Sequence, residues 1–494
     1  MNALLLYPEF PETFWSFKHA LRFIHKRAAL PPLGLLTVAA MLPRDWNLRL
    51  VDMNVQKLKD ADLRWADMIF VSAMIAQRAS VNETLARCSA LGKPIVAGGP
   101  LFTSDQDGFP EVTHFILNEA ELTLAPFLAD LAAGKALRVY ASAAFADVHA
   151  TPRPRWELAR LSYYSSMSVQ YSRGCPFDCE FCDVTAKFGH LPRTKTAAQV
   201  LAELADLRHC GWKGPVFFVD DNLIGNKRTL KLELLPALTA WQRANGRKFP
   251  FYTEASINLA DDSVLMEQMA EAGFDTVFVG IETPDAAALA ECNKRQNQGR
   301  DLVADVKRIQ RAGLQVQGGF IVGFDSDLPS IFQRQIDFIQ QSGVVTAMVG
   351  ILNALPGTRL HARLDREGRL LHDTSGNNSD GSLNFTPTMP AQQLLDGYRE
   401  VLRRIYSPHP YYQRVRTFLR EYKRPKITAP VEWRHLLALL LSSVRLGVIG
   451  RERFEYWGLL AWTAAHRPRL IQLAVTFAIY GHHFRKCCAA LQVT

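Results

Sequence analysis

The 494-residue chain lacks a disulfide framework, a long apolar run and a low-complexity tract, and each absence argues against one class of protein. Its eight cysteines are few and unevenly placed, which argues against a disulfide-stabilised fold and favours a reducing cytoplasm. We find no apolar stretch of the roughly twenty residues that a transmembrane helix needs, and the first residues lack the basic leader of a signal peptide. Glycine and proline are dispersed, so we expect no long disordered region.

The charge balance is mildly basic, with a formal net charge of +9, and much of the excess follows Arg399. A solvated basic surface explains this, and an anionic membrane surface or an anionic cofactor explains it equally well. No nucleic-acid recognition motif is present, so we expect no nucleic-acid partner. The length allows two or three domains with a large core.

The most informative stretch is Tyr171–Asp183, in which Cys175, Cys179 and Cys182 form the pattern C-x3-C-x2-C. Zinc sites usually need four ligands, and no fourth ligand follows nearby. Thiolates at such spacing hold iron–sulfur clusters. Three ligands for a four-iron cube leave one iron open to bind and activate a substrate. We therefore predict that these cysteines are metal ligands and catalytic.

The other cysteines do not extend this site. Cys88, Cys210 and Cys292 are isolated, and we expect them to be small core residues. Cys487 and Cys488 are adjacent and cannot form a metal site alone.

Residues 1–150 alternate strand and helix signals, which predicts a doubly wound parallel sheet with helices on both faces. The expected strands are 3–7, 48–52, 65–72, 94–98 and 115–117. Ligands of such sheets bind beyond the carboxyl ends of the strands. Here those ends carry 52–54, 72–77, 98–103 and 118–121. The proline-containing stretch 151–155 predicts an extended linker.

Residues 156–360 repeat six strand–helix units, which predicts a partial or closed (β/α)6 barrel of the TIM type. The expected strands are 166–172, 215–219, 249–254, 276–280, 316–322 and 346–352. Thr196 and Gln199 form a predicted capping box, and several helices stop at glycine. The cysteine loop directly follows the first strand, at the edge where parallel barrels collect their chemistry.

The cysteine loop, with Phe181 before its last cysteine, resembles the cluster loop of the radical S-adenosylmethionine (SAM) enzymes. Residues 218–227 and 251–256 are similar to the cobalamin-binding branch that includes the hopanoid C-2 methylase. The resemblance runs from about Met1 to about Tyr422. It implies a Rossmann-like cobalamin-binding domain before a radical SAM barrel, with a [4Fe–4S] cluster, SAM and cobalamin as cofactors.

The resemblance also implies roles for single residues. Glu254 lies near the SAM ribose, and the turn from Gly280 to Glu282 lies near the rest of SAM. Ser256 and Phe181 are further expected SAM contacts, and Gly98, Gly99 and Thr103 are expected near the nucleotide tail of cobalamin. From its position just before the cysteine loop, and not from the resemblance, Arg173 is expected to screen the cluster charge. For each acid, including Asp220 and Asp221, the alternative is a structural salt bridge at the barrel rim.

Two positions depart from the family pattern. The histidine motif D-x-H-x-x-G, which supplies a lower cobalt ligand in many cobalamin proteins, is absent because Met53 and Asn54 follow Asp52. The usual Gly-Glu-Ala-Glu reads Asn118-Glu-Ala-Glu121. The first departure implies a cobalt without a histidine beneath it.

Residues 361–494 predict a helical region that is both basic and apolar. The expected helices are 394–406, which the prolines at 408 and 410 break, then 434–446, 454–465 and 470–483. Trp457, Trp462 and nearby arginines suit an interfacial helix, so a peripheral membrane contact stays open. Packing over the barrel mouth is the other interpretation.

The resulting hypothesis is a cytoplasmic cobalamin-dependent radical SAM enzyme, a C-methyltransferase acting on an unactivated carbon of a lipid-like or isoprenoid small molecule. The resemblance implies that a 5′-deoxyadenosyl radical takes a hydrogen and that cobalamin delivers the methyl group, with a flavodoxin- or ferredoxin-type reductant. A radical enzyme that rearranges or cyclises its substrate remains an alternative. An iron–sulfur electron carrier or a cobalamin sensor is the alternative of another class.

Overall fold

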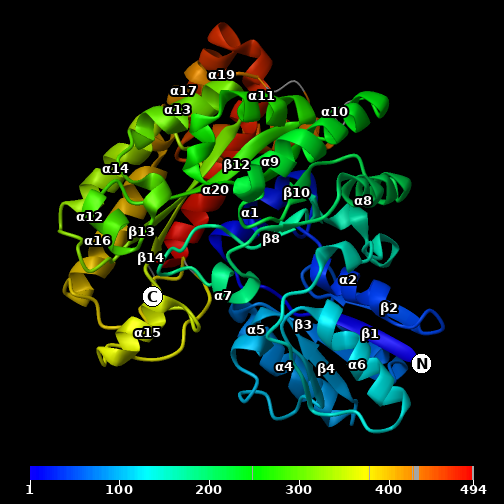
Figure 1. Ribbon diagram of the computed structural model, residues 1–494. Coiled ribbons are helices and arrows are strands. Elements are labelled where there is room, and N and C mark those ends of the chain that lie inside the picture. The colour runs from blue at the N-terminus through cyan, green and yellow to red at the C-terminus, as the bar shows by residue number, and fades with distance from the viewer. Residues whose placement is uncertain (247–248, 378, 425–426, 428–432, 492–494) are drawn as a thin grey trace.

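The computed structural model describes residues 1–246, 249–377, 379–424, 427 and 433–491, which form two parallel sheets and a helical C-terminal part (Figure 1). The first sheet has the order β2-β1-β3-β4-β5-β6 and is parallel throughout, which confirms the doubly wound prediction. Its strands are β1 (Asn2–Tyr7), β2 (Asn47–Asp52), β3 (Met68–Ser72), β4 (Ile95–Gly98), β5 (His114–Ile116) and β6 (Val139–Tyr140). The strand order reverses between β1 and β3, and ligands of such sheets bind beyond this switch point.

Helices cover both faces of the first sheet, as its nearly continuous apolar strands require. They are α2 (Leu33–Met41), α3 (Asp60–Trp65), α4 (Arg78–Ala90), α5 (Pro100–Ser104) and α6 (Ala120–Ala132), whereas α1 (Lys18–Leu21) packs against the C-terminal helix α20 (Ile471–Leu491). The third strand begins at Met68 rather than at the predicted residue 65. Trp65 instead ends α3, in which Asp62 accepts a hydrogen bond from the backbone N–H of Lys59 at the helix start.

The second sheet has the order β14-β13-β12-β11-β10-β7, so it is a six-stranded barrel that stays open between its two edge strands. All five pairings are parallel, as predicted. The strands are β7 (Met167–Val169), β10 (Val216–Phe218), β11 (Phe251–Glu254), β12 (Phe274–Glu282), β13 (Gln315–Val322) and β14 (Ala347–Ile351).

Helices surround the outside of this barrel, and those that end at the predicted glycines are present. They are α8 (Ala197–His209), α9 (Lys227–Thr229), α10 (Leu235–Ala244), α11 (Ser263–Ala272), α12 (Ala286–Glu291), α13 (Leu302–Ala312) and α14 (Ile331–Ser342). The capping box of Thr196 and Gln199 is formed. Gly273 ends α11 with φ 109° and Gly313 ends α13 with φ 101°, a backbone conformation that favours glycine.

The C-terminal part consists of α15 (Arg359–Arg366), α16 (Ala391–Tyr406), α17 (Pro408–Glu421), α18 (Trp433–Val444), a π-helical turn η11 (Arg445–Ile449), α19 (Arg453–His466) and α20 (Ile471–Leu491). The sequence analysis missed α17. Ser407 ends α16 and also precedes α17, in which Pro408 occupies the first turn, where a missing N–H costs nothing. None of the helices in the described ranges meets the length and apolarity that crossing a bilayer requires. The boundaries at 150, 156 and 360 remain predictions.

The last helix, α20, packs against the N-terminal segment that follows β1. Phe484 stacks on Phe14 with ring centroids 4.3 Å apart, and the ring of Phe17 lies 5.0 Å from that of Tyr480. From the same segment, Trp15 contacts Phe278 on the inner face of β12 at 5.4 Å. Residues 14–17 therefore lie between α20 and β12, so segments from the two halves of the sequence pack together at the barrel.

The contact between Phe484 and Phe14 predicts a large loss of stability on truncation. Phe484 is fully buried, so Phe484→Ala is expected to cost about 3–5 kcal/mol in urea unfolding. Phe454, which is 78% exposed, provides the matched control, and Phe454→Ala is expected to stay within about 0.5 kcal/mol of the wild type. Equal effects of the two substitutions would contradict this packing.

Candidate functional site

The three cysteines lie on the loop between β8 (Ser172–Arg173) and α7 (Val184–Phe188), at the carboxyl edge of the barrel. Figure 1 places α7 between the two sheets. The loop starts at Gly174, whose φ is 99°. A Cβ there would lie 2.9 Å from the carbonyl oxygens of Gly189 and Leu191, so the close approach of these backbones requires glycine.

Asp220, at the end of β10, fixes the start of the cysteine loop. Its carboxylate accepts hydrogen bonds from the backbone N–H of Tyr171 and from the N–H and hydroxyl of Ser172, the last at 2.6 Å. Burial raises the pKa of Asp220 to about 7, against the effect of these hydrogen bonds. Asp220 thus has a structural role, but through hydrogen bonds to the loop rather than through the salt bridge that was the expected alternative.

Amide donors face two of the cysteine sulfurs. Asn222 Nδ2 lies 3.9 Å from Cys175 Sγ, and Gln296 Nε2 lies 3.7 Å from Cys179 Sγ. Burial raises the pKa of Cys182 to about 12, so this thiol ionises only with a compensating positive group such as a metal. Within the described ranges no three His, Cys, Asp or Glu side chains converge on a point that suits a single metal ion. A multi-iron cluster, in which each cysteine binds its own iron, fits this donor set better than one metal ion.

The isolated cysteines differ from one another. Cys88 and Cys292 are buried, as predicted, but Cys210 is exposed. The prediction for Cys210 was wrong because this residue ends α8, where the helix leaves the core.

Glu282 and Lys294 form a buried ion pair beside the cysteine loop, with Lys294 Nζ 2.5 Å from Glu282 Oε1. Burial alone would lower the pKa of Lys294, but Glu282 and the nearby sulfur of Cys179 raise it, so the lysine is charged. Its Nζ lies 5.9 Å from the ring centroid of Phe181. The sequence analysis missed Lys294, because no motif or periodicity marks it.

The turn that carries Glu282 is held in an unusual conformation. Glu282 has φ 64°, and Asn297 Nδ2 donates to the carbonyl oxygens of Gly280 and Ile281 at 3.1 and 3.0 Å. A Cβ on Gly280 would lie 2.8 Å from Lys294 Nζ, so the ion pair lies directly against this glycine. Strained backbone of this kind concentrates at functional sites.

Glu254 and Ser256 follow the neighbouring strand β11. Ser256 exchanges hydrogen bonds with Asn222, so it is joined to the surroundings of Cys175. Burial, together with the charges of Asp221 and Asp220, raises the pKa of Glu254 to about 8. A carboxyl held neutral by its surroundings at a barrel mouth is a candidate ligand contact.

The predicted cobalamin residues lie together at the carboxyl edge of β4. Gly99 has φ 94°, and a Cβ there would lie 2.8 Å from Ser72 Oγ. A Cβ on Gly98 would lie 2.7 Å from the Ile116 carbonyl oxygen. Thr103 Oγ1 accepts a hydrogen bond from the N–H of Asn118. Both glycines thus pack closely against neighbouring backbone and carry no side chain at this edge.

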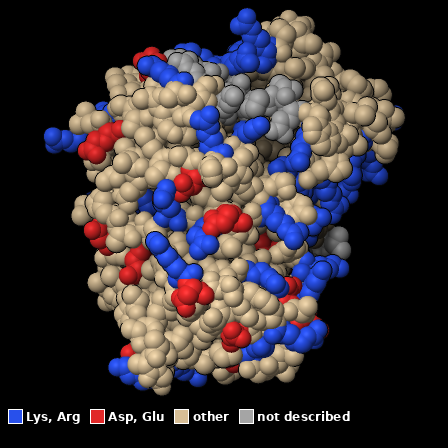
Figure 2. Space-filling model, turned by 90° about the vertical axis from the view of Figure 1, so that its right-hand side faces the viewer, with Lys and Arg blue, Asp and Glu red and all other residues tan. Residues whose placement is uncertain are grey.

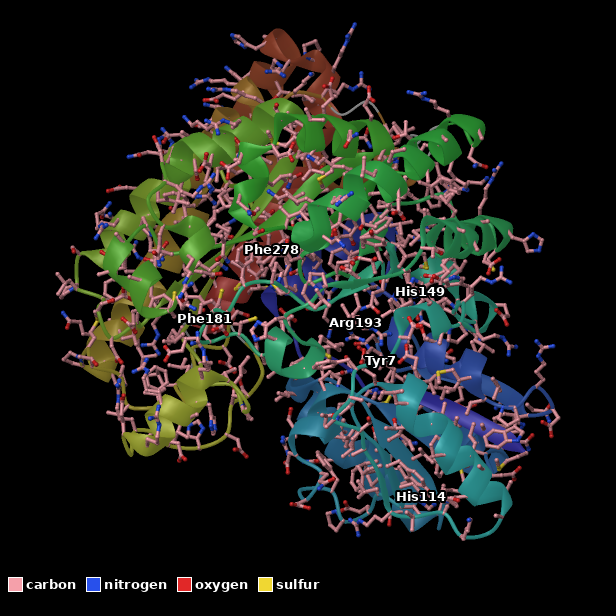
Figure 3. The ribbon with its side chains drawn as sticks, in the orientation of Figure 1. Tyr7, His114, His149, Phe181, Arg193 and Phe278 are labelled. Carbon is pink, nitrogen blue, oxygen red and sulfur yellow. The ribbon has the colours of Figure 1, made fainter. Side chains whose placement is uncertain are left out.

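At the positions where the histidine motif is absent, the side chains form a closed network of hydrogen bonds. Asn54 donates to Asp52 at 2.8 Å and to the carbonyl oxygen of Pro8, and Tyr164 donates to the other oxygen of Asp52. The side chain of Asn54 is thus engaged within the loop. Figure 3 shows Tyr7 at the switch-point edge and His114 at the far end of this sheet, away from the barrel.

An ion network joins the two sheets. Arg173 binds Glu119 and Glu121, each at 2.7 Å, and Arg193 binds Glu119 at 3.1 Å. Burial alone would raise the pKa of Glu121, but the hydrogen bonds and charge of Arg173 and the hydrogen bond of Thr151 lower it. Arg173 thus contacts the Asn118–Glu121 segment. Among the residues that the structure describes, Lys294 is then the positively charged side chain beside the cysteine sulfurs. Figure 3 shows Arg193 in the region between the two sheets.

The pKa of Glu254 predicts a pH-dependent stability difference. A carboxyl whose pKa rises from 4.5 to about 8 on folding stabilises the folded state below pH 4.5, and this contribution is lost as the pH rises to about 8. Cofactor-free Glu254→Gln is therefore expected to gain stability over the wild type across this window, by at most roughly 1.4 kcal/mol per pH unit in urea unfolding. The exposed-site control Glu111→Gln is expected to stay within about 0.5 kcal/mol. A pH-independent difference for Glu254→Gln would contradict the shift.

Three parts of the chain match known families. Residues 25–128 match the B12 binding domain, residues 169–339 the radical SAM superfamily, and residues 358–493 a domain of unknown function, DUF4070. The chain is also similar in fold to the radical S-adenosylmethionine methyltransferase TsrM from Kitasatospora setae, solved with cobalamin and a [4Fe–4S] cluster. The TM-score is 0.63 at 13% identity, covering 99% of both chains.

Two relatives are much closer in sequence. An uncharacterized methyltransferase of Synechocystis sp., sll1242, is 42% identical over 491 residues, which cover 98% of this chain and 91% of the relative. The hopanoid C-2 methylase of Rhodopseudomonas palustris is 36% identical over 418 residues, which cover 84% and 78%. With both cofactor domains matched and both relatives named for methyl transfer, the chain belongs to the cobalamin-dependent radical SAM methyltransferases, enzymes that use a [4Fe–4S] cluster, SAM and cobalamin.

Proposed function

We propose that this enzyme is a C-methyltransferase that acts on an unactivated carbon of a lipid-like small molecule through a 5′-deoxyadenosyl radical. The observation that carries the proposal is the apposition of two carboxyl edges, one bearing the cysteine loop and the other bearing Gly98 and Gly99, joined by the Arg173 network. When bound, the cluster supplies the electron, SAM the radical and cobalamin the methyl group. The protein holds these groups close and excludes water.

In this proposal Cys175, Cys179 and Cys182 hold the cluster, and the polar residues around them tune it. Asn222 and Gln296 direct N–H donors at two sulfurs, which stabilises negative charge there. Lys294 adds a buried positive charge beside the cluster site. The open iron leaves a coordination site for the amino and carboxylate groups of SAM.

The carboxyl groups at the barrel mouth are proposed to orient SAM. Glu254 lies at the carboxyl edge of the barrel and accepts hydrogen bonds from the ribose hydroxyls. Ser256 fixes the neighbouring loop through Asn222. The Gly280–Glu282 turn lies beside the remainder of SAM, together with Phe181. In the first domain Gly98, Gly99 and Thr103 lie along the nucleotide tail of cobalamin.

The inner face of the barrel supports a lipid-like substrate. Phe217 and Tyr252 stack with centroids 4.7 Å apart on β10 and β11, and Trp15 meets Phe278 on β12. Figure 3 shows Phe278 within the barrel. Aromatic walls favour an apolar substrate, and hopanoids, which one relative methylates by name, are isoprenoid lipids. The proposed reductant is a flavodoxin- or ferredoxin-type protein.

The cluster assignment predicts the effect of cysteine replacement. Triple replacement of Cys175, Cys179 and Cys182 by alanine is expected to remove the roughly four irons bound per chain after anaerobic reconstitution, and with them the formation of 5′-deoxyadenosine from SAM. Cys210 is exposed and serves as the control, and Cys210→Ala is expected to keep both the bound iron and the formation of 5′-deoxyadenosine. Iron retained at the wild-type level in the triple variant would overturn the assignment.

The methylation itself is tested by product analysis. The reconstituted enzyme is expected to form S-adenosylhomocysteine together with 5′-deoxyadenosine when it is supplied with a lipid extract of a deletion strain. The same extract is expected to gain a species heavier by one methylene. Formation of 5′-deoxyadenosine without S-adenosylhomocysteine would favour a rearranging or cyclising enzyme instead.

A further inference from the structure

The face formed by α18, η11 and the start of α19 is apolar on its outside. Among the described residues, ten of the twenty-three exposed large hydrophobic side chains fall within residues 433–457. We call these ten the α18–α19 face: Trp433, Leu436, Leu439, Leu440, Leu441, Val444, Val448, Ile449, Phe454 and Trp457. The three aromatic side chains alone, at roughly 150–250 Å² each and 49–78% exposed, present on the order of 400 Å², to which the seven aliphatic side chains add their own area. A typical monomer exposes apolar patches of only a few hundred Å².

The pattern of α18 is the reverse of an ordinary surface helix. Its buried side chains are the small Ala438 and the polar Ser442, which hydrogen-bonds Tyr456 of α19. Its outward stripe carries Leu436, Leu440 and Val444, which are 64%, 62% and 47% exposed. A surface helix normally turns its large apolar residues to the core, so these residues require a different partner.

The segment of α18, η11 and α19 is held firmly in this orientation. Trp457 Nε1 donates to the carbonyl oxygen of Gly447 at 2.9 Å, and the guanidinium of Arg445 lies 6.0 Å from the ring of Phe23. The apolar surface is therefore a fixed feature of the fold.

Positive charge surrounds the apolar side chains. Arg445, Arg451 and Arg453 are exposed, and Arg453 lies 5.1 Å from the ring of Phe454. The two acids of this segment are engaged, since Glu452 is buried against Arg485 and Glu455 bonds to His409. In the upper right of Figure 2, Lys and Arg border a broad area that shows neither Asp nor Glu.

We propose that the α18–α19 face docks the enzyme peripherally on an anionic phospholipid bilayer. Leucine, tryptophan and phenylalanine enter the boundary between headgroups and acyl chains, while the arginines meet the anionic headgroups. Apolar insertion and the attraction of the arginines act together, because apolar burial alone does not distinguish anionic from neutral lipid. The proposal extends the lipid-like substrate of the proposed function, but it depends only on this surface.

The test is flotation of the full-length protein with vesicles of phosphatidylcholine that contain about one quarter phosphatidylglycerol. The wild type is expected to float with them and to bind pure phosphatidylcholine vesicles at least ten-fold more weakly. Leu440→Glu with Phe454→Glu is expected to lose at least ten-fold in binding. Replacing Arg445, Arg451 and Arg453 by glutamine is expected to weaken binding roughly five-fold per arginine.

The matched control is Leu232→Glu with Leu328→Glu, which adds the same charge at two apolar sites that are 68% and 69% exposed elsewhere. It is expected to bind within two-fold of the wild type. The proposal is overturned if the wild type does not float, if it binds both vesicles equally, or if the control loses binding as fully as the test variant. It is also overturned if light scattering finds a wild-type dimer that the test variant breaks and that does not bind vesicles.

Failure of this proposal is distinguishable from failure of the proposed function. Each variant is assayed for cleavage of SAM to 5′-deoxyadenosine with a chemical reductant in the absence of lipid. Cleavage at the wild-type rate together with lost flotation supports docking as a separate property of this face.

Discussion

The structure depends on the buried ion network that ties Arg173 to Glu119 and Glu121. Arg173 is 12% exposed, and its two partners are 4% and 7% exposed. Charges removed from water in this way are stable only when each has its partner, because one buried charge left alone costs about 3–5 kcal/mol. Since Arg173 stands two residues before Cys175, and the acids follow β5, the network sets the distance between the cysteine loop and the first sheet.

This constraint explains how two ordinary folds produce one site. A doubly wound sheet and a parallel barrel each collect ligands at the carboxyl ends of their strands. Here the two edges face each other, with α7 between the two sheets (Figure 1). The chemistry of methyl transfer needs the methyl donor and the radical source on the same substrate, and opposed edges meet that need. The N-terminal segment, α20 and the aromatic inner face then exclude water.

Sequence could predict what is encoded locally. The cysteine spacing, the strand–helix alternation and the capping box of Thr196 lie within short windows, so the two sheets and the cluster loop followed from them. Lys294 could not be predicted, because its partner Glu282 is twelve residues away across a helix and its charge is explained only by burial. Arg173 was assigned to the cluster because sequence adjacency suggested it, whereas folding brought Glu119 and Glu121 closer. The helix α17 was missed because a proline that ends one helix can also begin the next.

The surface of the C-terminal part complements this interior. In the proposed function a barrel lined by Phe217, Tyr252 and Phe278 takes an apolar substrate, and the reversed pattern of α18 is proposed to bring the enzyme to a bilayer. The arginines that surround this face account for part of the positive charge that the sequence shows after Arg399. Both features serve the proposed lipid-like substrate.

The most direct measurement is a double-mutant cycle on Arg173 and Glu121, using Arg173→Met and Glu121→Gln in the reconstituted enzyme. The readout is the ratio of S-adenosylhomocysteine to 5′-deoxyadenosine. If the network sets the distance between the two halves, each single variant lowers this ratio while iron content is kept, and the double variant loses less than the sum of both. An unchanged ratio in the single variants, or strictly additive losses, would contradict the account.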